Sequence, residues 1–97
     1  MAAGDSVVGM VSAAASAVVD LQPPVGAEWE VQNIFYATQI TLQWFDGTNI
    51  LAFLTSSGTA GGAYLNATYR CTNTYRLRLL NPTASAQLIG YSGVQTK

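Results

Sequence analysis

Histidine is absent from this chain of 97 residues, and cysteine and lysine occur once each, as Cys71 and Lys97. Proton transfer near neutral pH usually uses histidine, or a carboxylate or lysine whose pKa is shifted by burial or a neighbouring charge. A zinc site needs three or four cysteine, histidine or carboxylate ligands at short spacings, and one thiol without an imidazole does not supply them. We therefore expect no enzyme activity, no catalytic residue, no metal site and no cofactor, and we expect Cys71 to be a buried, inert thiol.

Charged residues are also scarce, at 9% of the chain against a usual value of about 25%, whereas apolar residues make up 49%. So few charges cover the surface of a free monomer poorly, which favours association with other chains. The four basic residues are not clustered, so we expect no binding to nucleic acid.

The charges are separated along the chain. The acidic residues all lie within positions 1–46, and the basic residues all lie within positions 70–97. One interpretation is electrostatic complementarity between neighbouring subunits. The other, which we favour, is pairing across neighbouring strands of one sheet.

Long apolar runs and targeting signals are missing as well. The most apolar early segment, from Val7 to Val19, is interrupted by Gly9, Ser12 and Ser16 and is shorter than the about 20 residues that span a bilayer. The first basic residue is Arg70, so the basic start of a secretory signal is absent. We expect no membrane partner and synthesis in a reducing cytoplasm.

What the sequence does contain is alternation typical of β-strands. In residues 28–36, Trp29, Val31 and Phe35 are expected on one face and Tyr36 on the other. Residues 39–45 repeat the pattern, with Trp44 on the apolar face. The turn residues 46–49 and the apolar run 50–55 then predict a hairpin over residues 39–55.

Further strands are predicted at 63–71, with a bend near Asn66, at about 75–79, and at 86–94, where Gly90 and Gly93 are expected to mark bulges or a close backbone approach. The small residues 56–62 predict a loop. The fold class is therefore all-β, a compact β-sandwich or small barrel of jelly-roll type with about six to eight short strands.

The N-terminal segment allows two arrangements. We divide the chain into an N-terminal arm, residues 1–19, and a β-domain, residues 20–97, which begins beside Pro23 and Pro24. Fully extended, the arm would reach on the order of 60 Å and could pair with a neighbouring chain. The alternative is that it folds back onto its own sheet. If it is a separate arm, deleting residues 2–19 should leave the β-domain folded and weaken assembly.

Three segments carry a resemblance to a known group of proteins. They are Asp20–Val31, which contains a QPP-x-G-x-x-W pattern, Thr72–Leu79, and Ile89–Val94, which contains YSG. Together they resemble small virion proteins of tailed bacteriophages, in particular capsid cement or decoration proteins. The resemblance implies a protein without an active site that binds the outside of a phage head, often as a trimer, and bridges neighbouring major capsid proteins.

The expected partners are therefore the major capsid protein and further copies of this chain, as a homotrimer, and the expected location is the virion. The alternative function is a module of a phage tail fibre or baseplate, or a receptor-binding module that grips a host glycan. In that case exposed aromatic side chains would matter, although Trp29 and Trp44 are expected in the core. The residues predicted to contact a partner are Val7, Val8, Val11, Tyr36, Phe45, Arg76 and Arg78.

Overall fold

The computed structural model describes residues 3–56 and 60–97. Within these ranges the chain forms nine β-strands and no helix. The strands are β1 (Ser6–Ala13), β2 (Val18–Leu21), β3 (Trp29–Tyr36), β4 (Thr41–Phe45), β5 (Ile50–Thr55), β6 (Gly62–Tyr64), β7 (Tyr69–Cys71), β8 (Arg76–Leu80) and β9 (Gln87–Gln95).

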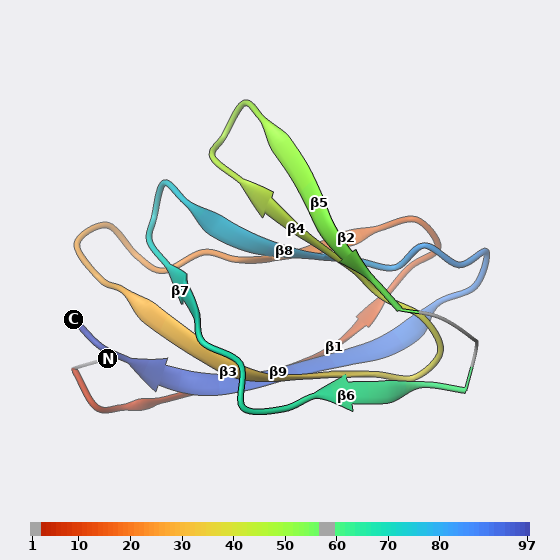
Figure 1. Cartoon of the computed structure of the whole chain (residues 1–97), viewed down its shortest axis with the longest axis horizontal. Coiled ribbons are helices and arrows are strands. Elements are labelled where there is room, and N and C mark those ends of the chain that lie inside the picture. Colours follow the sequence, from red (N-terminus) through yellow and green to blue (C-terminus); the bar gives the residue numbers. More distant parts are fainter. Residues whose placement is uncertain (1–2, 57–59) are drawn as a thin grey trace.

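The strands form two antiparallel sheets that lie one above the other (Figure 1). The first sheet has the order β1-β9-β3-β6, and β7 pairs with the other end of β3. The second sheet has the order β2-β8-β4-β5. This arrangement is a small β-sandwich and confirms the all-β fold class that the alternating sequence predicts.

The predicted turns lie where the sequence places them. Residues 39–55 form the β4–β5 hairpin, and Gly47 in its turn has a φ of 97°. The predicted bend is present, because Asn66 has a left-handed backbone conformation with a φ of 58°. It separates β6 from β7. One expected strand therefore becomes two. The predicted loop 56–62 lies in part outside the described residues, because positions 57–59 are not described.

The N-terminal segment folds back onto its own chain. β1 pairs with β9 along its whole length, from Ser6 opposite Val94 to Ala13 opposite Gln87. β2 pairs with β8 in the second sheet, and the expected boundary between residues 19 and 20 lies inside β2. Of the two arrangements that the sequence allows, the structure has the second. Its physical reason is that β9 gains a complete ladder of backbone hydrogen bonds from β1.

The core lies between the sheets. Its buried side chains come from strands of both sheets and from the segment before β4, and they are Ala13, Leu21, Val31, Ile34, Ile40, Leu42, Cys71, Leu77, Leu79 and Ile89. Trp29 and Trp44 are partly buried and pack against this cluster, as the sequence predicts. Alternation in β8 places Leu77 and Leu79 inward and the two arginines outward.

Charges pair within the chain. Arg78 lies 2.7 Å from Asp20 across the β2–β8 pair, and Arg70 lies 3.6 Å from Glu30 across the β3–β7 pair. Near the C-terminus, Lys97 lies 3.7 Å from Glu28. Strand pairing brings the acidic first half against the basic second half, which is the favoured of the two interpretations of the charge order.

Candidate functional site

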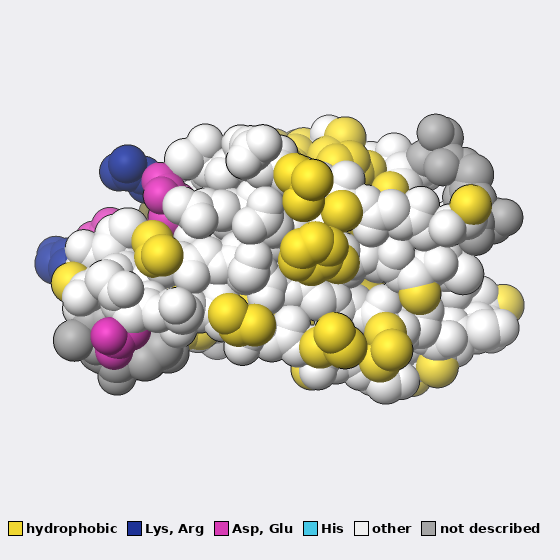
Figure 2. Space-filling model, turned by 90° about the horizontal axis from the view of Figure 1, so that it is seen from below, with side chains coloured by type: hydrophobic (Ala, Val, Ile, Leu, Met, Phe, Trp, Pro, Cys, Tyr) yellow, Lys and Arg dark blue, Asp and Glu magenta, His cyan; other side chains and the backbone are white. Residues whose placement is uncertain are grey.

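The outer face of the first sheet carries a cluster of exposed apolar side chains. Alternation along β1 and β9 turns Val8, Met10 and Leu88 away from the core, and their exposed fractions are 71%, 72% and 54%. Phe35 on β3 joins them and is 43% exposed. Figure 2 shows apolar side chains gathered on this underside of the molecule. We call Val8, Met10, Phe35 and Leu88, with Gly90 between them, the apolar face.

Gly90 makes a hollow in the middle of the apolar face. It lies opposite Met10 on one side and opposite Phe35 on the other, so three neighbouring strands meet at a position without a side chain. The resulting shallow pocket has a volume of about 230 Å³ and is lined by Met10, Phe35, Tyr36, Ala37, Leu88 and Gly90.

A β-bulge in β3 decides that Phe35 is exposed. The pairing of β3 with β9 shifts between Val31 and Asn33, so alternation restarts after the bulge. Ile34 is consequently fully buried, and Phe35 lies on the opposite, outer face. The expectation that Phe35 shares the apolar inner face with Trp29 and Val31 is therefore wrong. The expectation that Tyr36 lies on the opposite, outer face is also wrong, because Tyr36 packs against the core. Simple alternation does not reveal the extra residue.

Gly93 lies directly at this bulge. A Cβ atom at this position would meet the backbone oxygen of Glu30 and the Cα of Val31, both closer than 3.0 Å. The predicted close backbone approach is therefore confirmed at Gly93. At Gly90 the nearest atom to such a Cβ is the backbone oxygen of Gly9, at 3.4 Å, which is ordinary contact.

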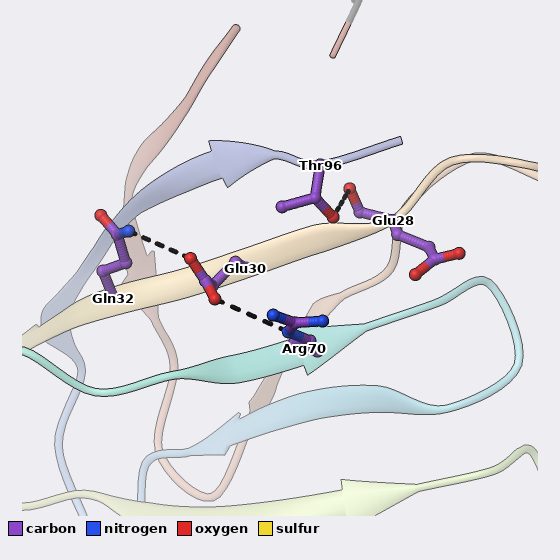
Figure 3. Close-up of polar contacts among 5 residues, drawn as sticks. All are labelled: Glu28, Glu30, Gln32, Arg70 and Thr96. Carbon is purple, nitrogen blue, oxygen red and sulfur yellow. Dashed lines mark hydrogen bonds and ion pairs between the residues drawn. The ribbon is translucent and has the colours of Figure 1, made fainter. Parts of the chain in front are cut away.

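Polar side chains occupy the other half of the same outer face. Arg70 Nε lies 3.6 Å from Glu30 Oε1, and Gln32 Nε2 donates to Glu30 Oε2 at 3.2 Å (Figure 3). Asn33 Nδ2 donates to Ser92 Oγ at 3.0 Å between this group and the apolar face. Apolar contacts bordered by polar groups are typical of protein interaction surfaces.

The predicted contact residues separate into two places. Val8 belongs to the apolar face, and Tyr36 lines its pocket, although Tyr36 is only partly exposed and packs against the core. Val7 is 4% exposed and belongs to the protein interior. Val11, on the same side of β1 as Val7, is 38% exposed. Met10 and Leu88 are not among the predicted contact residues, although the alternation of β1 and β9 places both side chains outward.

The other three predicted residues meet on the outer face of the second sheet. The guanidinium carbons of Arg78 and Arg76 lie 3.9 and 4.7 Å from the centre of the Phe45 ring, a cation–π arrangement. Asp20 holds Arg78 through two hydrogen bonds, of 2.7 and 3.2 Å. Phe45 is therefore engaged with its own chain and offers a partner less apolar surface than the sequence suggests.

Residues 3–56 and 60–97 hold no group of three or more His, Cys, Asp or Glu side chains that could bind a metal ion. Burial raises the pKa of the Cys71 thiol to about 11, so this thiol is protonated at neutral pH. Among these same residues no helix is long and apolar enough to cross a membrane.

Comparison with known proteins gives no family assignment. No protein-family model matches this chain, and no curated protein matches it significantly.

Proposed function

We propose that this protein is a structural virion protein, a capsid cement or decoration protein that binds the outer surface of a phage head and bridges neighbouring major capsid proteins. The apolar face is the observation that carries the proposal. Its four large apolar side chains are solvent-exposed, and Met10, Phe35 and Leu88 line a pocket between the strands. Exposed apolar clusters of this kind mark interaction sites.

The composition supports the same function. A cement protein buries part of its surface on the capsid, so a charged fraction of 9% costs it little solubility once it is bound. The apolar face lies on three strands that pair continuously, so it keeps its shape without a partner. A preformed surface loses little conformational entropy on binding.

The test is co-sedimentation of the full chain with expanded phage heads. The wild-type protein should co-sediment, and Met10→Lys should weaken binding by at least about tenfold, because a charged group would have to be desolvated against the capsid. Val25→Lys is the matched control, since Val25 is 87% exposed and lies outside the apolar face. Failure of the wild-type protein to bind heads would rule out the cement function. Equal weakening of binding by both variants would show that the apolar face is not the surface that contacts the capsid.

A second candidate is a glycan-binding module of a phage tail fibre, baseplate or receptor-binding protein. A pocket of about 170 Å³ is lined by Trp44, Phe45, Asp46, Asn49, Leu51 and Tyr75, a mixture of aromatic and polar groups found in carbohydrate sites. However, Asp46 accepts hydrogen bonds from the backbone of Thr48 and Asn49, so its carboxylate is already engaged in the turn. Quenching of tryptophan fluorescence by host-surface glycan, with loss of the effect in Tyr75→Ala, would favour this candidate.

A further inference from the structure

β5 is the outermost strand of the second sheet. Within the described residues it pairs with β4 alone, and its other edge is open. In Figure 1 the β4–β5 hairpin extends away from the first sheet. Every residue of β5 except Leu54 is exposed, and the exposed fractions of Ile50, Leu51 and Phe53 are 55%, 65% and 38%.

This edge lacks the features that normally keep sheet edges apart. Proteins protect open edges with charged side chains, with proline or by keeping the strand very short. β5 has six residues, and none is charged or proline. The sequence contains no charged residue between Asp46 and Arg70. By contrast, the edge strand β2 has four residues and carries Asp20.

Two hydrogen bonds show which backbone groups face the open edge. Asp46 N donates to Asn49 O at 3.3 Å, and Ser56 N donates to Ile40 O at 2.9 Å, at the two ends of the β4–β5 pair. Bonded and non-bonded pairs alternate along antiparallel strands. Counting from the bonded pair Asp46–Asn49, the next bonded pair is Trp44–Leu51, in which the backbone of Leu51 is hydrogen-bonded to β4. The backbone N–H and C=O groups of Ile50 and Ala52 therefore point to the open edge.

We propose that β5 pairs antiparallel with β5 of a second copy of this chain. A two-fold axis at Leu51 sets Ile50 against Ala52 of the second copy, so the free backbone groups of both strands are satisfied. Leu51 then faces Leu51 of the second copy in a non-hydrogen-bonded pair, where side chains lie closest.

A second copy suits this edge better than an unlike chain. The strand has no charge with which to select a partner of opposite charge, and two copies bring no like charges together. A two-fold contact is self-complementary, so exposed apolar side chains of one copy meet the same side chains of the other. The apolar face lies on the other sheet and stays free, so this contact does not depend on the capsid function.

The first test is the mass of the full chain in solution by light scattering over a range of concentrations. The wild-type protein should have twice the mass of one chain, and Ala52→Lys should have the mass of one chain, because a lysine charge blocks edge pairing. Val25→Lys, at an exposed position outside β5, should remain dimeric. A two-fold dimer differs from the homotrimer that the resemblance to cement proteins implies, so a trimer would overturn the proposal. A wild-type monomer, or a dimer that persists in Ala52→Lys, would also overturn it.

The second test locates the axis by disulfide formation. Leu51→Cys should form a covalent dimer under mild oxidation, since facing residues in a non-hydrogen-bonded pair have Cα atoms about 4.5 Å apart, within disulfide range. Ile50→Cys is the control, because its counterpart on the second copy is Ala52. It should cross-link at least about tenfold more slowly. Equal rates for the two variants would show that β5 does not pair in this register.

Discussion

Gln87 and Asn81 share a buried hydrogen bond, in which Gln87 Nε2 donates to Asn81 Oδ1 at 2.8 Å. Asn81 Nδ2 also donates to the carbonyl oxygens of Ala13 and Ser85, at 3.0 and 2.8 Å. Gln87 Oε1 accepts a hydrogen bond of 2.8 Å from Thr38 N. Two side-chain amides therefore join the ends of β1, β3 and β8 to the start of β9.

Replacing Asn81 by alanine should destabilise the protein by about 3 kcal/mol, because the buried network would lose the amide that donates to Ala13 O and accepts from Gln87 Nε2. Denaturant unfolding followed by circular dichroism measures this loss. Gln32→Ala is the control, since Gln32 makes its hydrogen bond to Glu30 on the partly exposed outer face. A loss for Asn81→Ala no larger than that for Gln32→Ala would contradict a structural role for the network.

The bulge in β3 requires glycine at position 93. Gly93→Ala should lower stability by about 2 kcal/mol or more, because its Cβ overlaps backbone atoms of Glu30 and Val31 that cannot move independently. Gly90→Ala should unfold close to the wild-type midpoint, because its Cβ has room. The added methyl group should also fill part of the pocket between Met10 and Phe35. Thermal unfolding gives the midpoint temperature of each variant, and equal midpoints would argue against the close approach at Gly93.

Residues 6–13 are part of the sandwich, so deletion of residues 2–19 should now abolish the fold. The deletion removes β1 and half of β2, leaving β9 with an open edge. A graded test uses neighbouring valines: Val7 is 4% exposed, whereas Val8 is 71% exposed. Val7→Ala should cost about 2 kcal/mol and Val8→Ala less than about 0.5 kcal/mol. A deletion variant that keeps its β-type circular dichroism spectrum would show that residues 2–19 form a separate arm and are not needed for the fold.

The thiol of Cys71 should make stability depend on pH in the alkaline range. Its pKa in the folded state is raised to about 11 from an ordinary value of 9.0. Below the ordinary value the thiol is protonated in both the folded and unfolded states, and its contribution is fully present. As the pH rises toward about 11, only the unfolded state ionises, so the free energy of unfolding falls.

Unfolding experiments in reducing buffer between pH 8 and pH 11 check this dependence. Cys71→Ala should be less stable at every pH, because it leaves a cavity in the core. Its free energy of unfolding should also fall less steeply with pH, and the difference from wild type isolates the thiol from the tyrosines. Parallel curves would show that Cys71 is not the group responsible. A thiol reagent at pH 8 should modify the folded protein only after denaturant is added, because thiolate is rare and the side chain is buried.

Local patterns in the sequence were sufficient for much of the fold. Residue types at 75–79 predicted the strand β8, and the turn residues 46–49 predicted the β4–β5 hairpin. The bend near Asn66 was also predicted, and the structure shows it as a positive φ, which asparagine adopts at low cost. Among the predicted contact residues, Val8 belongs to the apolar face, and Tyr36 packs against the core while lining the pocket in that face.

The fold class follows from the sequence alone, because period-two alternation and turn chemistry are local properties that a short window contains. The pairing of β1 with β9 is evident only in the three-dimensional structure, since residues so far apart in sequence leave no local signal of which strands become neighbours. The three-dimensional structure also decides that Phe35 faces outward, because a bulge changes the face of every following residue without changing the residue types. The apolar face depends on both of these long-range pairings.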